Sequence, residues 1–225
     1  MIEKCIFAIL IFIMKKTSFF EENSKSLLFI AAAIFILAAI ALYYFASYLP
    51  GRADKAAAQM YKAEQYLGVD SLANKAINGE GGYPGFTQIA DEYANTKSAN
   101  LANLYLGGIY LRKGEYQKAI ESLGKYSATG SPVADPLALG LLGDAYSELK
   151  DYAQAASNYK KAAEKASNKF TSPMFLKKLG LVQEQLKDFK AAEETYTKIK
   201  NQFPDSQEAS VIDSYIARAA AEQGK

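Results

Sequence analysis

The stretch LYLGGIYLRKGEYQKAI, from Leu104 to Ile120, decides the fold of this chain. Its apolar residues recur at helical spacing, yet two glycines, Gly107 and Gly108, stand in the middle of it. A glycine inside a helix costs about 1 kcal/mol relative to alanine. A helix that carries this cost is expected to have another element packed closely against it.

The pair Leu-Gly returns along the chain. Leu106–Gly107 is followed by Leu142–Gly143 and Leu179–Gly180, at spacings of 36 and 37 residues. Residues at fixed distances after each leucine also match from unit to unit. These residues are Tyr110, Tyr146 and Gln183, then Tyr116, Tyr152 and Phe189, then Ala119, Ala155 and Ala192, and finally Leu123, Tyr159 and Tyr196.

This spacing predicts a helix–turn–helix unit, and the pattern resembles the tetratricopeptide repeat, which has a period of about 34 residues. The residue after each leucine, Gly107, Gly143 or Gly180, is expected to face the second helix where the two helices cross. A side chain there would overpack the crossing, which costs more than the glycine does. Gly108 falls on the inner face of the first helix instead. The third unit departs at Gln183, where an aromatic residue is expected, and this predicts looser packing.

Prolines and capping residues mark the ends of the predicted helices. Asp135 precedes Pro136 and Ser172 precedes Pro173, so each is expected to cap a helix whose first turn holds the proline. Pro204 closes the last unit. Residues 207–225 are expected to form a terminal helix that closes the core of the array. Its apolar face would carry Ala209, Ile212, Ile216 and Ala219.

An atypical first hairpin is predicted over residues 50–99. Phe86–Tyr93 has the spacing of a second helix, and its first helix would lie near Lys55–Leu67. Between them stands the glycine-rich segment Asn78–Gly85. It lacks the Lys-Ser/Thr of a phosphate-binding loop and has no strand before it, so a plain loop insertion is the better interpretation.

The segment 26–49 is predicted to cross a membrane. It contains no charged residue, no glycine and no proline, and spanning a bilayer takes roughly 20 apolar residues in a helix. Tyr43, Tyr44, Phe45 and Tyr48 cluster at its end, as in an aromatic belt. A cleaved signal peptide is disfavoured, because the apolar run exceeds the usual ~7–15 residues and ends in bulky aromatic residues.

A shorter apolar run, Cys5–Met14, precedes this segment and reaches only about half-way across a bilayer. Lys15 and Lys16 follow it, and we favour Met14 as the true start of translation. A signal-like segment or an embedded hairpin arm is the alternative. The nearby lysines and arginines are balanced across the span, so the positive-inside rule decides little about its orientation.

The expected fold is therefore all-α, with a transmembrane helix followed by a tetratricopeptide-like superhelix of helical hairpins and a capping helix. The expected boundaries are a cytoplasmic tail over 1–25, the span over 26–49 and the atypical hairpin over 50–99. Three repeat units over 100–206 and the cap over 207–225 complete the chain.

The composition argues against most kinds of chemistry. The chain has no histidine, and its one cysteine, Cys5, allows neither an internal disulfide nor a cysteine-based metal site. A formal net charge of +2 gives no basic field for nucleic acid. We expect no enzyme, no metal, no cofactor, no nucleic acid and no small-molecule substrate. A hydrolase would need a titratable site that the sequence does not offer.

A superhelix of hairpins offers an extended inner surface that suits peptides or helices. The surface is apolar at one end and mixed at the other, and it lacks the ring of lysine, arginine and asparagine that would clamp a carboxylate. The candidate partner-binding groove consists of Leu101, Leu104, Gly108, Leu111, Leu137, Gly140, Asp144, Met174, Lys177 and Leu181.

The order of tail, span and repeats resembles a narrower family, the ancillary subunit of the bacterial Sec translocon. The tail FFEENSK at Phe19–Lys25 and the alanine-rich helix after the span are similar to that family. The resemblance implies an anchor in the inner membrane with the N-terminus in the cytoplasm and the repeats in the periplasm. It implies the translocon channel and a periplasmic chaperone-isomerase as partners. A membrane-tethered scaffold for another envelope or secretion complex is the alternative.

Overall fold

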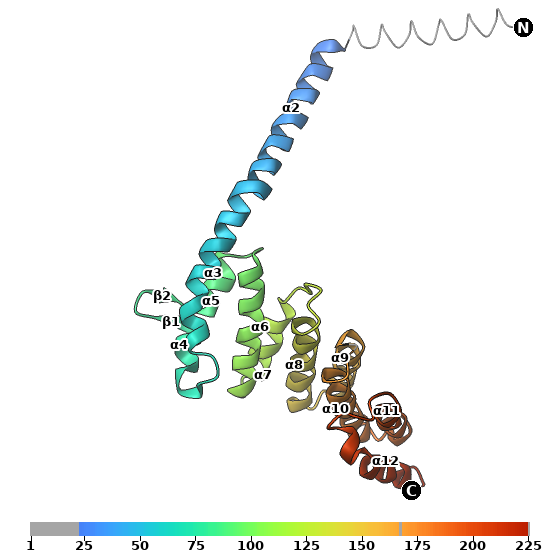
Figure 1. Ribbon diagram of the computed structural model, residues 1–225. Coiled ribbons are helices and arrows are strands. Elements are labelled where there is room, and N and C mark those ends of the chain that lie inside the picture. The colour runs from blue at the N-terminus through green and yellow to red at the C-terminus, as the bar shows by residue number, and fades with distance from the viewer. Residues whose placement is uncertain (1–22, 167, 225) are drawn as a thin grey trace, which may run out of the picture. The chain divides into compact units, whose positions relative to one another are not determined.

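The computed structural model describes residues 23–166 and 168–224, and it divides into two compact units (Figure 1). The first unit is Met1–Asp54 and the second is Lys55–Lys225. The Cys5–Met14 run, the proposed start at Met14 and most of the tail lie outside the described residues.

The described part of the first unit, residues 23–54, is helical, and its last helix continues into the second unit. α2 covers Ser24–Tyr43, a π-helical turn η1 covers Tyr44–Tyr48, and α3 covers Leu49–Gln65. The helical stretch Ser24–Gln65 is long and apolar enough to cross a membrane, by length and composition. The large apolar side chains of α2 that the structure describes are exposed, and Phe35, for example, is 76% exposed.

The helix continues past the predicted boundary at Leu49. Pro50 and Gly51 lie in the first turn of α3. A proline has no N–H, and its ring crowds the carbonyl four residues before it. The π turn stands directly before this proline, and the N–H of Leu49 donates to the carbonyl of Tyr44. The wider turn relieves the crowding, so the proline does not end the helix.

The glycine-rich segment is a hairpin, so the expectation of a plain loop is wrong. After η2 (Asp70–Leu72) and α4 (Ala73–Asn78), strands β1 (Gly79–Glu80) and β2 (Tyr83–Pro84) pair antiparallel and lead into α5 (Phe86–Glu92). Gly81 and Gly82 have φ of 61° and 82°, as a tight two-residue turn requires. A Cβ on Gly79 or Gly85 would overlap backbone atoms of the facing strand or helix.

Three helical hairpins follow, and they confirm the all-α, tetratricopeptide-like fold (Figure 1). Each second helix packs on its own first helix and on the first helix of the next hairpin. The hairpins are α6 (Lys97–Arg112) with α7 (Tyr116–Gly124), α8 (Ala134–Glu148) with α9 (Tyr152–Ala166), and α10 (Thr171–Gln185) with α11 (Phe189–Gln202).

The glycine of each Leu-Gly pair lies against a large side chain of the second helix. A Cβ on Gly143 would lie 2.6 Å from the ring of Tyr159, and one on Gly180 would overlap the ring of Tyr196. A Cβ on Gly107 would overlap Leu123 in the same way. The repeat alanines Ala119, Ala155 and Ala192 are fully buried at the same crossings.

The turn inside each hairpin also repeats. Its last residue has positive φ, with values of 74° at Gly114, 61° at Lys150 and 60° at Lys187. The next N–H donates over 2.9 Å to the carbonyl five residues before it, which belongs to Tyr110, Tyr146 or Gln183. This is the Schellman arrangement that ends helices. Tyr110 and Tyr146 are half-buried and pack on the core.

Gln183, the exception in the aromatic series, is paired across its hairpin. The hydroxyl of Thr195 donates to its side-chain oxygen over 2.8 Å. A polar contact between α10 and α11 thus takes the place of the expected aromatic packing, and the predicted looseness does not describe this pair.

Neither predicted capping residue caps its helix. α8 begins at Ala134 and α10 at Thr171, so Asp135 and Ser172 lie one residue inside the first turn. Instead the Ser131 hydroxyl accepts from the N–H of Ala134. A buried side chain one residue inside a helix points back along the chain, where it meets the preceding loop.

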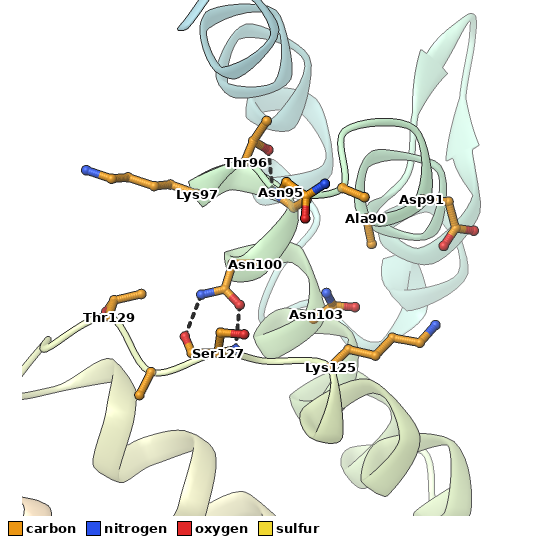
Figure 2. Close-up of a pocket in the computed structure, with 13 residues that line it drawn as sticks. Ala90, Asp91, Asn95, Thr96, Lys97, Asn100, Asn103, Lys125, Ser127 and Thr129 are labelled. Carbon is orange, nitrogen blue, oxygen red and sulfur yellow. Dashed lines mark hydrogen bonds between the residues drawn. The ribbon is translucent and has the colours of Figure 1, made fainter. Parts of the chain in front are cut away.

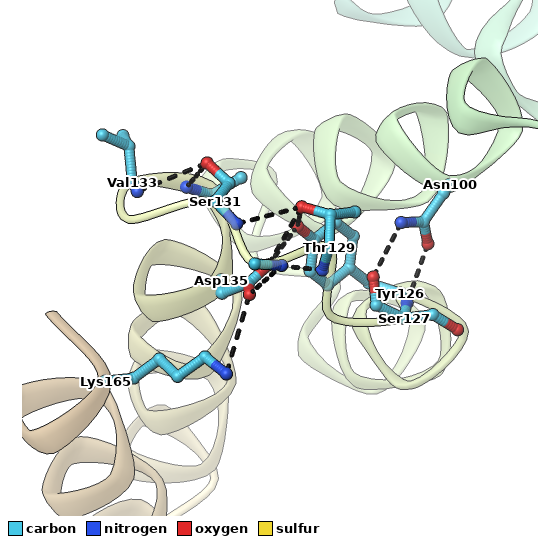
Figure 3. A network of polar contacts seen from close by, with 10 residues as sticks. Asn100, Tyr126, Ser127, Thr129, Ser131, Val133, Asp135 and Lys165 are labelled. Atoms are coloured by element: carbon cyan, nitrogen blue, oxygen red, sulfur yellow. Dashed lines mark hydrogen bonds and ion pairs between the residues drawn. The ribbon is translucent and has the colours of Figure 1, made fainter.

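The buried carboxylate of Asp135 holds the loop before α8 (Figure 3). It accepts from the N–H groups of Thr129 and Gly130, each over 2.9 Å, and from the hydroxyl of Tyr126 over 2.8 Å. Lys165 of α9 stands 3.8 Å away. The carboxylate therefore joins one hairpin to the next.

The chain ends in a helix that covers the last hairpin. A 3-10 turn, η3 (Ala209–Val211), precedes α12 (Ile212–Glu222), so the helix begins later than predicted. Ile212 and Ala219 are fully buried against α11, and Ile216 packs beside them. Pro204 is exposed, two residues after the end of α11.

The two kinds of glycine position give a test of this packing. Gly143→Leu should lower stability by about 1–3 kcal/mol or more, because the new side chain meets the Tyr159 ring. Gly108→Leu should lower it less, because the nearest atom to a Cβ there is Leu141 Cδ1 at 3.9 Å. Thermal melts of the detergent-solubilised protein measure both. A larger loss from Gly108→Leu would contradict the assignment of helix faces.

Asp135 predicts how stability depends on pH. Burial alone would raise the pKa of its carboxyl, but hydrogen bonds from Thr129, Tyr126 and Gly130 outweigh burial and hold it below its usual range. A lowered pKa stabilises the fold above the pKa of the unfolded chain, about 4, and this contribution is lost as pH falls through the folded-state pKa.

Asp135→Asn should therefore cost about 1–3 kcal/mol at pH 7, and the gap to the wild type should shrink below about pH 4. Urea unfolding at pH 7 and pH 3 measures this difference. Asp213→Asn is the matched control, since Asp213 forms an exposed ion pair with Lys200 and should change little. An equal gap at both pH values would contradict the role given to the carboxylate.

Candidate functional site

The candidate site is the surface formed by the first helices of the hairpins, α6, α8 and α10 (Figure 1). α6 contacts α8 directly. α8 contacts α10 through Gly140 and the ring of Phe175, and also through an ion pair. The three helices therefore form a continuous row within the second unit.

Most of the predicted groove residues are accessible on this row. Leu137 of α8 is 40% exposed and Leu181 of α10 is 38% exposed. Large apolar side chains with this exposure can contact a partner. The half-buried members of the predicted groove are Leu101, Gly108, Leu111, Asp144, Met174 and Lys177.

Two predicted groove residues belong to the core instead. Leu104 is buried with Leu123 and Ala138, between α6, α7 and α8. Gly140 is buried because Phe175 of the next hairpin lies directly on it. Both face the neighbouring hairpin, so the open surface is narrower than the sequence predicts.

Two carboxylates of this surface, Asp144 and Glu184, are each paired with a cation. Lys178 of α10 donates to both carboxylate oxygens of Asp144 in α8, over 2.6 and 2.8 Å. The hydroxyl of Tyr159 donates to the same carboxylate over 2.6 Å. Burial, and then the contact with Asp144, raise the pKa of this phenol far above its usual range. Asp144 therefore links two hairpins.

The same arrangement recurs one hairpin later. Arg218 of α12 donates to both carboxylate oxygens of Glu184, over 2.8 and 2.9 Å, and the hydroxyl of Tyr196 donates to Glu184 over 3.1 Å. Burial, followed by the nearby Glu184, raises the pKa of Tyr196. Two cations lie close to the ring of Tyr215, with Lys177 at 4.9 Å and Arg218 at 4.7 Å from its centroid.

Sequence analysis did not single out Lys178, Tyr215 or Arg218. One signal was available, because Asp144 and Lys178 are 34 residues apart, as are Glu184 and Arg218. An acid and a base that recur at the same spacing are candidates to pair between neighbouring helices.

The titratable groups of this surface are held by contacts within the fold. Its carboxylates are paired, and its buried phenols keep their protons at neutral pH. Among the described residues, none of the acidic clusters has the arrangement to hold a metal ion. The predicted groove leucines that remain accessible on α6, α8 and α10 are Leu101, Leu111, Leu137 and Leu181, here called the leucine row. Paired charges lie beside them.

Family comparisons agree with this architecture. A model described as a tetratricopeptide repeat-like domain matches residues 17–138, more than half of the chain. Models described as tetratricopeptide repeat match residues 137–167 and 178–206. No curated protein and no solved structure matches the chain. The protein belongs to the tetratricopeptide repeat-like domain family.

Proposed function

We propose that this protein is a membrane-anchored interaction module that serves the bacterial Sec translocon as an accessory subunit and links it to periplasmic chaperones. The observation that carries the proposal is the order of the parts. The family match begins at residue 17 and runs through the apolar helix into the first repeats. One family model matches the apolar segment together with the first repeats. This favours an anchor that stays attached to the repeats over a leader that is removed.

The aromatic end of the apolar helix supports the anchor. Tyr44 packs on Phe45 and Tyr48, and Arg52 donates to the hydroxyl of Tyr48 over 3.2 Å. Tyrosines followed by an arginine are typical of the boundary between lipid and water. A retained anchor would hold the repeats beside any channel in the same membrane.

The leucine row on α6, α8 and α10 supports a protein partner. Tetratricopeptide arrays bind peptides and helices on their inner surface, and here Leu137 and Leu181 remain exposed. The paired charges beside them favour an apolar or amphipathic segment over a free carboxylate. A scaffold for another envelope or secretion complex would use the same surface, so the identity of the captured partner separates the two functions.

Membrane topology gives the first test. Protease added to spheroplasts should digest the repeats and leave a fragment of roughly 5 kDa, because the bilayer shields only the tail and the apolar helix. The fragment is followed by gel electrophoresis with an N-terminal epitope tag. Protection of the repeats until the membrane is lysed would reverse the orientation. A mature chain whose N-terminal sequence begins after Tyr48 would show a cleaved signal sequence.

Site-specific crosslinking tests the partner. A photoreactive amino acid at Leu137 or Leu181 in the full chain, expressed at its native level, should crosslink the Sec channel or a periplasmic chaperone-isomerase. Mass spectrometry of the adducts identifies the partner. The matched control is Glu164, an exposed residue of α9 that lies outside the leucine row.

Adducts with subunits of another envelope complex would favour the scaffold. Equal adducts from Glu164 would contradict a specific role for the leucine row.

A further inference from the structure

A polar cavity of about 600 Å³ lies where α5 ends, α6 begins and the chain leaves α7 (Figure 2). A smaller cavity of about 220 Å³ shares Asp91, Asn103 and Lys125 with it. The two cavities thus meet at these side chains. Neither cavity contains a residue of the leucine row, so this is a second surface of the repeat unit.

Asn103 stands at a position where the other repeats carry leucine. It precedes the leucine of its Leu-Gly pair by three residues, as do Leu139 and Leu176 in the next units. Leu176 is buried in the core, and Leu139 is partly buried and packs against the same core cluster. Asn103 is only 9% exposed. The first hairpin therefore places a primary amide where the repeat calls for a large apolar side chain.

The amide of Asn103 makes no hydrogen bond within the part of the chain that the structure describes. Every fully enclosed side-chain N or O atom there does have a partner, so this amide stays open to the cavity. A polar amide at a core position of the repeat, with its polar atoms open to a cavity, calls for an explanation. Asn158 shows the contrast, because it is 8% exposed and donates to the Gln154 carbonyl over 2.8 Å.

The neighbouring asparagine shows which chemistry fits. Asn100, one turn earlier on α6, donates to the carbonyl of Ser127 over 2.7 Å and accepts from its N–H over 2.7 Å (Figure 2). A primary amide has one donor side and one acceptor side, so it pairs with a peptide group in this way. Asn103 carries the same group three residues further along the helix, beside the larger cavity.

The charges around the cavity indicate the character of the ligand. The lining includes Lys97 and Lys125, both exposed, against one carboxylate, Asp91. The excess of positive charge favours an acidic ligand. We propose that this cavity binds an extended acidic peptide segment of a partner protein, with Asn103 paired to its main chain and the two lysines facing its carboxylates. The proposal does not depend on which complex the protein joins.

Stability gives the first test, with the full chain in nanodiscs. Asn103→Leu restores the residue of the other repeats and buries apolar surface at this position, so it should raise the melting temperature by about 2–8 °C. Asn158→Leu is the matched control and should not raise it, because that amide is already paired. A lower melting temperature for Asn103→Leu would overturn the proposal, since the amide would then have a structural role.

Binding gives the second test. A phage library of random heptapeptides is selected on the wild-type chain and counter-selected on Asn103→Leu. The selected peptides should be rich in aspartate and glutamate, and they should lose at least tenfold in affinity on Asn103→Leu and on Asn103→Ala. The alanine variant removes the amide without filling the cavity. Lys125→Gln should weaken binding several-fold and reduce its salt dependence.

Peptides that bind the Asn103 variants within twofold of the wild type, or a selection without acidic enrichment, would overturn the proposal. Failure to enrich any peptide would do the same. None of these results bears on the leucine row, because crosslinking from Leu137 and Leu181 tests that surface separately.

Discussion

The close approach of the two helices in each hairpin is the constraint on which the repeat unit depends. In the second hairpin the Tyr159 ring occupies the space that a side chain on Gly143 would need, and Tyr196 does the same at Gly180. The cost of a glycine within a helix, about 1 kcal/mol, is small beside the loss of a fully buried aromatic contact. Glycine is therefore the residue that permits the large side chain opposite.

The same contact also sets the chemistry of the surface. The tyrosine of the second helix packs its ring on the glycine of the first helix, and its hydroxyl donates to a carboxylate of that same helix. The carboxylate is Asp144 for Tyr159 and Glu184 for Tyr196. Each carboxylate then accepts hydrogen bonds from a cation of a later helix, Lys178 of α10 or Arg218 of α12. Packing inside one hairpin is thus coupled to the joint with the next. The surface is left with these two carboxylates paired and with Leu137 and Leu181 exposed.

Periodicity predicted the units, because contacts inside a hairpin depend on residues at fixed spacing. It failed where contacts depend on the angle between hairpins, as at Leu104 and Gly140, which face the neighbouring hairpin. It also failed at Asp135, whose partners lie in the preceding loop and have no fixed spacing. The accessibility of most predicted groove residues followed from the sequence, whereas the burial of Leu104 and Gly140 required the packed structure.

Departures from the repeat have different physical meanings, and their partners tell them apart. Gln183 replaces an aromatic residue but receives a hydrogen bond from Thr195, so the hairpin absorbs the change. Asn103 replaces a leucine, lies beside a cavity and receives no such bond within the described chain. A polar substitution that finds a partner adds to the specificity of packing, whereas one that is left open to a cavity keeps its donors and acceptors available to a ligand. That difference is the reason why we propose a second binding surface on the first hairpin and none at Gln183.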